Sequence, residues 1–487
     1  MRHIFNTTAV FGCATLIAGC AAGPDYVRPA DALPKSYTAQ ATAAAGEGAQ
    51  TLDTTLDIPA QWWQLFHSPA LNELITASLQ HNPTMEAAQA ALRQAQENVS
   101  AQQGAFYPSV DASYAPTRQK VAGTLSSPLA SNAYYYNLHT AQVTVSYVPD
   151  LFGANRRQVE SLQAQAQSQR YQLEATRLTL TSNVANAAIQ EAMLRAQIGA
   201  TREMVSAQTT LLAMFRKQFD LGQVAQADVA AQEAALAATE ANLPPLEKQL
   251  SAQRNLLTAL AGRFPEDGAG AAFDLDALQL PATLPLTLPA RLVEQRPDVR
   301  VAEEDLHAAS AQIGVAAANR LPNITLGVNA WGSSASSLSD LFKSGTGFWS
   351  LAASVTQPVF DGGTLKHRQG AAQAAYDQAA AQYRGTVIVA FQNVADALNA
   401  IEYDATALRA ATSAERAADK SLAIGRRQLA LGDISPMALL ASEQAWQLAR
   451  FNLAQARANR LADTVALFQS LGGGWWNRDA AEKSAAN

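Results

Sequence analysis

Four short segments of the chain alternate between apolar and polar residues with a period of two. This period is typical of a β-strand that has one apolar face and one polar face. Each run is about ten residues long, the length that a tilted strand needs to cross the hydrocarbon layer of a membrane. A soluble sheet with one wet face gives the same alternation, so that alternative stays open. The predicted strands lie at about 108–118, 138–149, 322–332 and 347–357.

Two stretches without proline, 154–220 and 364–431, carry apolar residues at mixed spacings of three and four. The spacing predicts α-helices that pack as a coiled coil, and at 1.5 Å per residue each helix would be about 100 Å long. A glycine turn and a second helical stretch follow each of them. The sequence therefore predicts two long helical hairpins, at 154–262 and 364–471.

The second half of the chain repeats the first. Pro83 matches Pro297, and Pro108 matches Pro322, at the same offset along the chain. Solenoid repeats run only to about 50 residues, so this much longer period indicates that a whole helix, strand and hairpin unit was duplicated. The predicted segments are a leader at 1–19, an N-terminal segment at 20–68, a first repeat at 69–280, a second repeat at 281–474 with a helix at 297–319, and a tail at 475–487.

The N-terminus has the pattern of an export signal. Arg2 and His3 precede an apolar run, 4–17, that is too short to span a bilayer as a mature helix. The run ends in a motif similar to the bacterial lipoprotein box, which predicts cleavage before Cys20 and a lipid on its sulfur. An ordinary signal peptide with a chance cysteine is the alternative. Cys13 lies in the leader, so the mature chain would have no thiol left for a disulfide or a metal.

Charge and hydrophobicity limit the function further. The formal net charge of −6 does not attract nucleic acid. Nothing after the leader approaches the roughly 20 apolar residues of a transmembrane helix, so a mature chain that crosses a membrane must do so as a closed β-barrel. Four strands cannot close alone, because the smallest single-chain barrels have eight strands. Two copies would give eight strands with a filled interior and three would give twelve around a lumen, and the polar inward residues favour three.

Several motifs resemble those of one family. Three segments are similar to signatures of the TolC-like outer membrane efflux proteins. They are the start of the mature chain from Cys20 to Tyr26, the run 61–74 with its paired tryptophans, and the end of the second repeat at 471–475. The likeness is greatest to their lipoprotein branch, which is associated with multidrug pumps, and it covers nearly all of the mature chain.

The resemblance implies a mainly α-helical homotrimer with a membrane β-barrel. Each chain would give four strands to a twelve-stranded barrel, which continues as a periplasmic coiled-coil barrel of twelve helices. The belt around its middle would come from 31–68, 263–296 and 472–487. The resemblance also implies a lipid-anchored, passive exit duct in the outer membrane for drugs or other small toxic compounds. A pump of the resistance-nodulation-division type in the inner membrane would feed it through a periplasmic adaptor, a membrane fusion protein.

Charged residues flank the two predicted hairpin tips. Arg216 and Asp220 precede the first tip, while Arg426, Arg427 and Asp433 flank the second. Threefold symmetry would turn each into a ring of like charges that could gate the tunnel or bind cations. The alternative is that they are solvated charges that balance the helix dipole.

The turns themselves are predicted to meet the adaptor. Leu221-Gly222 and Leu431-Gly432 combine an apolar side chain with a glycine, which lets another helical hairpin pack closely. A plain left-handed turn without a partner is the alternative.

No catalytic constellation stands out. The histidines are scattered without metal-ligand spacing, and no Gly-x-Ser-x-Gly motif occurs. The sequence therefore predicts no enzyme activity and no cofactor beyond the lipid on Cys20. A protein-secretion duct of the type I kind, a structural coiled-coil lipoprotein and a periplasmic hydrolase are the competing hypotheses. Aromatic residues near the strand ends are candidates for an interfacial girdle: Tyr114, Tyr147, Trp331 and Trp349.

Overall fold

The computed structural model describes residues 21–29, 34, 36–38, 50–125, 132–268, 270–287 and 289–478. The predicted leader and the lipidation site Cys20 lie outside the described residues. The chain divides into two compact units. The sheet unit comprises Met1–Pro29, Leu92–Ser168 and Ala302–Tyr383, and the hairpin unit comprises Ala30–Ala91, Gln169–Val301 and Arg384–Asn487.

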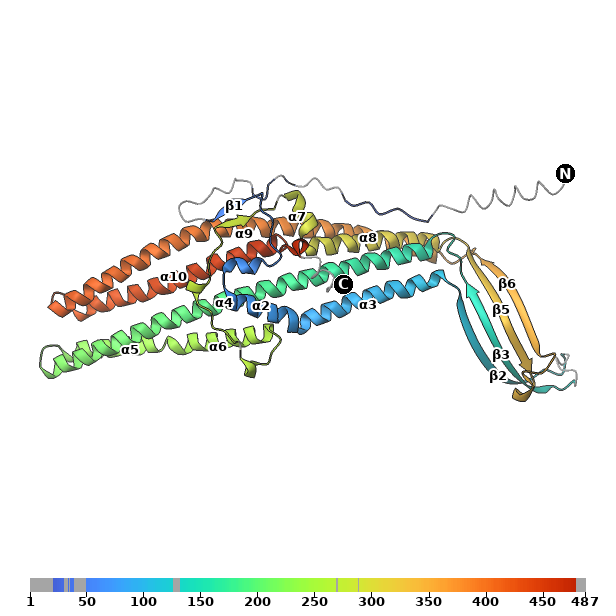
Figure 1. Ribbon diagram of the computed structural model, residues 1–487, viewed down its shortest axis with the longest axis horizontal. Helices are drawn as coiled ribbons and strands as arrows, with labels where there is room; N and C mark the ends of the chain where they lie inside the picture. The colour runs from blue at the N-terminus through green and yellow to red at the C-terminus, as the bar shows by residue number, and fades with distance from the viewer. Residues whose placement is uncertain are drawn as a thin grey trace. The chain divides into compact units, whose positions relative to one another are not determined.

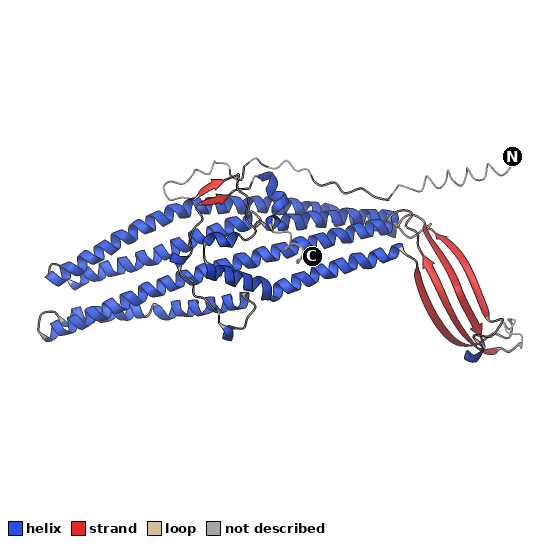
Figure 2. Cartoon of the chain, in the orientation of Figure 1, coloured by secondary structure: helices blue, strands red, loops and turns tan. Residues whose placement is uncertain are grey.

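The sheet unit is built on a four-stranded antiparallel sheet in the order β2-β3-β5-β6 (Figures 1 and 2). The strands are β2 (Ser109–Lys120), β3 (Tyr135–Tyr147), β5 (Asn323–Ala335) and β6 (Gly347–Thr356). Each repeat supplies one strand hairpin, and β3 pairs with β5 where the two repeats meet. The largest differences from the predicted bounds are at β3, which begins at 135 rather than 138, and at β5, which runs to 335 rather than 332.

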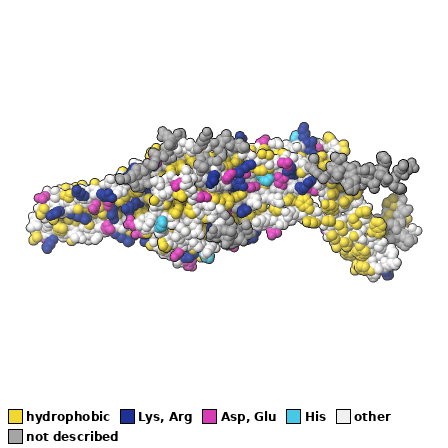
Figure 3. All heavy atoms as spheres, turned by 45° about the horizontal axis from the view of Figure 1, so that its top comes forward, with side chains coloured by type: hydrophobic (Ala, Val, Ile, Leu, Met, Phe, Trp, Pro, Cys, Tyr) yellow, Lys and Arg dark blue, Asp and Glu magenta, His cyan; other side chains and the backbone are white. Residues whose placement is uncertain are grey.

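One face of this sheet is apolar and exposed. The period of two places the apolar side chains of all four strands on one face, and Figure 3 shows hydrophobic side chains gathered over the sheet. The strongly exposed members on the edge strands are Val110, Tyr114, Trp349, Leu351 and Val355. A contiguous apolar surface of this kind is typical of a face that lipid or another protein covers.

Helices lead into and out of the strands. They are α3 (Pro83–Gln103), α8 (Pro297–Ala318), α4 (Ala154–Asp220) and α9 (Thr364–Leu431). The Asp150 carboxylate accepts the N–H groups of Asn155 at 3.0 Å and Arg156 at 2.8 Å at the start of α4. Asp361 accepts two N–H groups in the same way at the start of α9. A carboxylate here satisfies donors that the helix cannot pair and complements its dipole, so both repeats begin their long helix with one device.

The hairpin unit contains the returning helices. The 67-residue α4 pairs with α5 (Gln226–Glu240) and α6 (Leu243–Leu260), while the 68-residue α9 pairs with α10 (Pro436–Ser470). The first return is interrupted because Pro244 and Pro245 lack N–H groups and fit only the first turn of a helix. Of the helices that the structure describes, none is both long enough and apolar enough to span a membrane.

Short elements pack around the long helices of the hairpin unit. Trp62 and Phe66 are fully buried, and the Trp62 ring stacks on Phe468 with 5.4 Å between centroids. Trp475 donates its indole N–H to the carbonyl of Gln295 at 2.7 Å. Both tryptophans therefore take part in packing the short elements against the long helices. The elements are β1 (Thr51–Asp53) paired in parallel with β4 (Thr283–Pro285), α2 (Pro69–His81), α7 (Pro289–Gln295), and the 3-10 helices at Trp62–Phe66, Pro265–Asp267, Leu275–Ala277 and Trp475–Asn477. Two further 3-10 helices, Gly104–Phe106 and Leu338–Asp340, belong to the sheet unit.

Candidate functional site

The candidate site comprises the turns that close the two helical hairpins, here called the first tip (221–225) and the second tip (431–435). Gly222 has a φ of 72°, and the N–H of Gln223 donates to a carbonyl five residues back at 2.8 Å. Gly432 has a φ of 79°, and the N–H of Asp433 makes the same bond at 2.9 Å. Both turns are the helix-ending motif that requires a left-handed residue, so glycine is needed at each for backbone reasons.

Each tip presents an apolar side chain beside its glycine. Leu221 is 65% exposed and Leu431 is 70% exposed. A Cβ atom added at Gly222 or Gly432 would meet nothing within 4 Å, so the space above each glycine is open. The tips therefore leave room for a closely packed apolar partner, and docking of the adaptor at Leu221, Gly222, Leu431 and Gly432 stays a prediction.

The charged residues near the tips are all exposed: Arg216, Asp220, Arg426, Arg427 and Asp433. Two of them also pair with a carboxylate. Arg216 pairs with Glu233 on the opposite helix of its hairpin at 2.7 Å, and Arg426 lies 4.0 Å from Glu443.

The two aspartates do not occupy equivalent positions. Asp220 is the last residue of α4, whereas Asp433 follows its glycine and closes the turn with its own N–H. Rings of either residue would require further copies of the chain, so the gate remains a prediction.

Behind the tips, an apolar cluster joins the two hairpins. It is formed by side chains from α4, α9 and α10, with Val229, Leu429 and Ile434 packed against it. Its buried members are Met204, Leu211, Phe215, Leu422, Leu439 and Trp446. Because the cluster draws on both hairpins, it holds the first tip and the second tip together within one chain.

A buried carboxylate lies beside this cluster. Glu443 is 1% exposed, and its Oε2 accepts a hydrogen bond from the Gln208 amide at 3.3 Å. Burial raises the pKa of the Glu443 carboxyl above its ordinary value, although the Gln208 hydrogen bond and the charge of Arg426 act to lower it. The only sign of this residue in the sequence is a single carboxylate within the Ala- and Leu-rich start of α10.

Polar groups also close the other end of the cluster. The Trp446 indole N–H donates to Asp419 at 3.1 Å, and the Arg450 guanidinium lies 5.3 Å from the Trp446 ring centroid. Arg450 also lies within 4 Å of Glu203 and Glu415. These contacts connect α4, α9 and α10, and the sequence alone did not indicate them.

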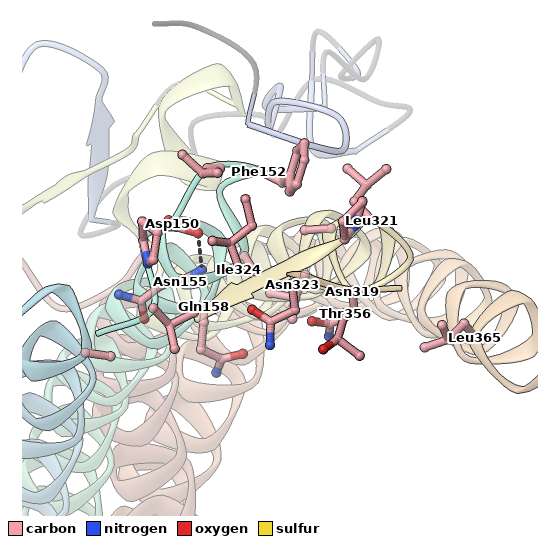
Figure 4. A pocket seen from close by; sticks show the side chains of 18 of the residues that line it. Asp150, Phe152, Asn155, Gln158, Asn319, Leu321, Asn323, Ile324, Thr356 and Leu365 are labelled. Atoms are coloured by element: carbon pink, nitrogen blue, oxygen red, sulfur yellow. Dashed lines mark hydrogen bonds between the residues drawn. The ribbon is translucent and has the colours of Figure 1, made fainter. Parts of the chain in front are cut away.

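The sheet unit holds a cavity of about 700 Å³ where the strands meet the helices (Figure 4). Its polar lining includes Asn155, Gln158, Asn319 and Asn323. The Asp150 carboxylate on its wall is already bonded to the start of α4, as the dashed line in Figure 4 marks. Across the described ranges, no cluster of three or more His, Cys, Asp or Glu side chains could hold a metal ion.

The segment 21–29, here called the strap, lies against the helices of the sheet unit. Asp25 pairs with the buried Arg157 of α4 at 2.6 Å, and Arg28 pairs with the buried Glu303 of α8 at 3.0 Å. The residue that the sequence predicts to carry lipid, Cys20, directly precedes the strap but lies outside the described residues.

A histidine anchors the centre of the strap. The Tyr26 ring stacks on His307 with 4.3 Å between centroids, and His307 lies between Glu160 at 3.1 Å and Glu304 at 3.6 Å. The neighbouring Glu304 carboxylate raises the pKa of His307 above its ordinary value, and the Glu160 carboxylate adds to this, whereas partial burial opposes both. The sequence showed His307 only as one of several scattered histidines.

Comparison with known proteins gives a consistent result. The family model described as outer membrane efflux protein matches residues 74–263 and 288–473. The chain is 28% identical over 479 residues to the toluene efflux pump outer membrane protein TtgC of Pseudomonas putida, and the match covers 97% of this chain and 96% of that protein. It is 27% identical to the outer membrane protein OprJ of Pseudomonas aeruginosa, with 97% of each covered.

Solved structures share the fold. The outer-membrane channel OprN superposes with a TM-score of 0.83 at 26% identity, covering 94% of this chain and 100% of that one. The Campylobacter jejuni CmeC outer membrane channel superposes with a TM-score of 0.86 at 21% identity, covering 96% of this chain and 98% of that one.

Proposed function

The chain belongs to the outer membrane efflux protein family and is the outer membrane channel component of an efflux system, and we propose that three copies form its exit duct. The family consists of transport channels and not of enzymes. In this proposal a periplasmic adaptor joins the hairpin tips to an inner-membrane pump of the resistance-nodulation-division type. The pump supplies the energy, and drugs or other small toxic compounds leave passively through the duct.

The observation that carries this proposal is the sheet with one exposed apolar face, whose outer strands β2 and β6 each pair on one side only among the strands that the structure describes. In lipid, every unpaired backbone group costs several kcal/mol, so such a sheet is stable only when its edges find partners. Three copies would supply twelve strands, enough for a ring around a water-filled lumen. The long hairpins would then continue the duct on the periplasmic side.

The proposal includes a lipid on Cys20. The strap supports it, because two ion pairs and the Tyr26 stack would fix the chain just after the lipidated residue. Cys20→Ser should abolish palmitate incorporation and leave the leader uncleaved. A labelled, processed Cys20→Ser protein would contradict the assignment.

The adaptor contact can be separated from the folding of the turns. Alanine in a left-handed turn costs about 1–2 kcal/mol, whereas asparagine tolerates that conformation and is the larger side chain. If the tips dock a partner, Gly222→Asn with Gly432→Asn should abolish drug resistance at least as fully as the double alanine variant, with normal amounts of assembled protein in the membrane. Gly385→Asn is the matched control, since Gly385 lies exposed in α9 with open space around it.

Two measurements decide the result: growth in the presence of drug, and copurification of the adaptor. Both should fail in the tip variants and persist in the Gly385 control. If the asparagine variant keeps full resistance while the alanine variant loses it, the glycines serve only the backbone, and the docking role of the tips is wrong.

A further inference from the structure

The two outer strands of the sheet, β2 and β6, each have one edge without a strand partner among the strands that the structure describes. The strand β2 pairs only with β3, and β6 pairs only with β5, among the strands that the structure describes. Every residue of both edge strands is exposed. If several copies share one sheet, as proposed above, β6 of one copy must meet β2 of the next. The internal repeat allows the alignment of that pair to be derived.

The strand hairpins of the two repeats define which residues are equivalent. In the first, Ser109 lies opposite Ser146, and in the second Asn323 lies opposite Thr356. Ser109 and Asn323 are separated by the same offset that relates the repeated prolines, and their partners are separated by a slightly shorter one. Each position in β2 therefore has an equivalent in β5 at the first offset. Each position in β3 likewise has an equivalent in β6 at the second.

The contact between the repeats within one chain serves as the template. In that contact β3 pairs with β5, with Ser146 opposite Gly327. By the two offsets, Ser146 is equivalent to Thr356 of β6, and Gly327 is equivalent to Ser113 of β2. We propose that β6 pairs antiparallel with β2 of a neighbouring copy, with Thr356 opposite that copy's Ser113.

This register keeps the two faces of the sheet continuous. It places Val355 opposite the neighbouring copy's Tyr114, and both residues belong to the exposed apolar face. Thr356 and Ser113 lie together on the polar face. A slip by one residue would move every apolar side chain of β6 to the polar face, so only slips by two residues are realistic rivals.

The register also accounts for an unusually exposed residue after β6. Val359 is 98% exposed. When the alignment is continued past Thr356, Val359 falls beside the neighbouring copy's Val110, which is itself exposed. The equivalent pair within the chain is Pro149 and Ile324, which line one cavity together. Assembly would thus cover the apolar pair in the way that the first repeat is covered within the chain.

Cysteine cross-linking of the full-length protein in its membrane tests the register. Ser113→Cys with Thr356→Cys places two thiols on the polar face, at the Cα separation of about 4.5–5.5 Å of directly opposed residues. Within one chain β2 and β6 are separated by three strand spacings, about 14 Å, which a disulfide cannot bridge. The disulfide must therefore join two copies. Most of the protein is expected to run as covalent oligomers on non-reducing gels, and a thiol reductant should return it to monomers.

Pairs shifted by two residues are the matched controls. Ser113→Cys with Ser354→Cys and Ala115→Cys with Thr356→Cys keep both thiols on the same face at about 7–8 Å, where cross-linking should be slow or absent. Faster cross-linking of a shifted pair overturns the register but leaves the shared sheet in place. No cross-link in any pair, from protein that sediments as an oligomer, overturns the pairing of β6 with β2. A monomer in the membrane would overturn the proposed duct as well.

Discussion

Replacing Phe215 by alanine should loosen the hairpin tips. Phe215 is 2% exposed and belongs to the apolar cluster that joins the two hairpins. Truncating a buried phenylalanine costs about 3–5 kcal/mol, from lost burial and from the cavity left behind. Since every 1.4 kcal/mol is a factor of ten, the opening equilibrium of this region should rise by about two to four powers of ten.

Amide hydrogen exchange measures this opening directly. In the assembled protein, peptides from the end of α4 and the start of α10 should exchange faster by that factor in Phe215→Ala. Peptides from the sheet should exchange as in the unchanged protein. The whole effect is expected only when opening separates the cluster completely, so a partial opening would give the lower end of the range.

Phe219 provides the matched control. It lies one turn further along α4 and is 43% exposed, so Phe219→Ala removes the same ring from outside the cluster. Its effect should stay within about 0.5 kcal/mol. If the two variants change exchange at the tips equally, the cluster does not hold the hairpins together, and the reasoning from burial is refuted.

Three further predictions concern charged groups. A raised pKa at His307 means that this residue's contribution to strap docking is complete below about pH 6.5 and is lost as the pH rises above its folded pKa. Release of the strap by proteinase K, corrected for protease activity, should therefore be slower at pH 6 than at pH 8. The variant His307→Asn should remove this difference. A raised pKa at Glu443 means that the native state keeps its proton to a higher pH than the unfolded state does. Stability should therefore fall as the pH rises from about 4.3 to the folded pKa, by at most about 1.4 kcal/mol per pH unit, and should level off above it. Melting curves of Glu443→Gln should lack this slope, and an unchanged slope would assign it to another group. Asp220→Ala with Asp433→Ala should change single-channel conductance and cation block in planar bilayers, and unchanged values would show that these residues are not the gate.

The regular elements were predictable because their signals are local. The alternation of apolar and polar residues around Val110 predicts a strand with one apolar and one polar face. The family comparisons confirm the predicted fold class. Gly222 and Gly432 ended their helices because a left-handed turn needs glycine. The failures involve contacts between distant segments. The burial of Glu443 depends on Gln208, which lies in the other repeat, and no local pattern encodes such a contact.

The docking of the strap could not be predicted either, because it also depends on contacts between distant segments. Tyr26 and His307 are each unremarkable in sequence, and only the fold stacks their rings. Strand pairing was intermediate, since the hairpins β2–β3 and β5–β6 follow from adjacency, whereas the β3–β5 contact depends on how the two repeats meet.

The interruption between α5 and α6 makes the two hairpins mechanically different. The return arm of the first hairpin consists of two helices separated at Ala241 and Asn242, whereas the return arm of the second, α10, is one helix of 35 residues. Bending stiffness drops wherever the ladder of helix hydrogen bonds is broken. We therefore expect the return arm of the first hairpin to bend more easily than α10, although the two hairpins come from one duplicated sequence.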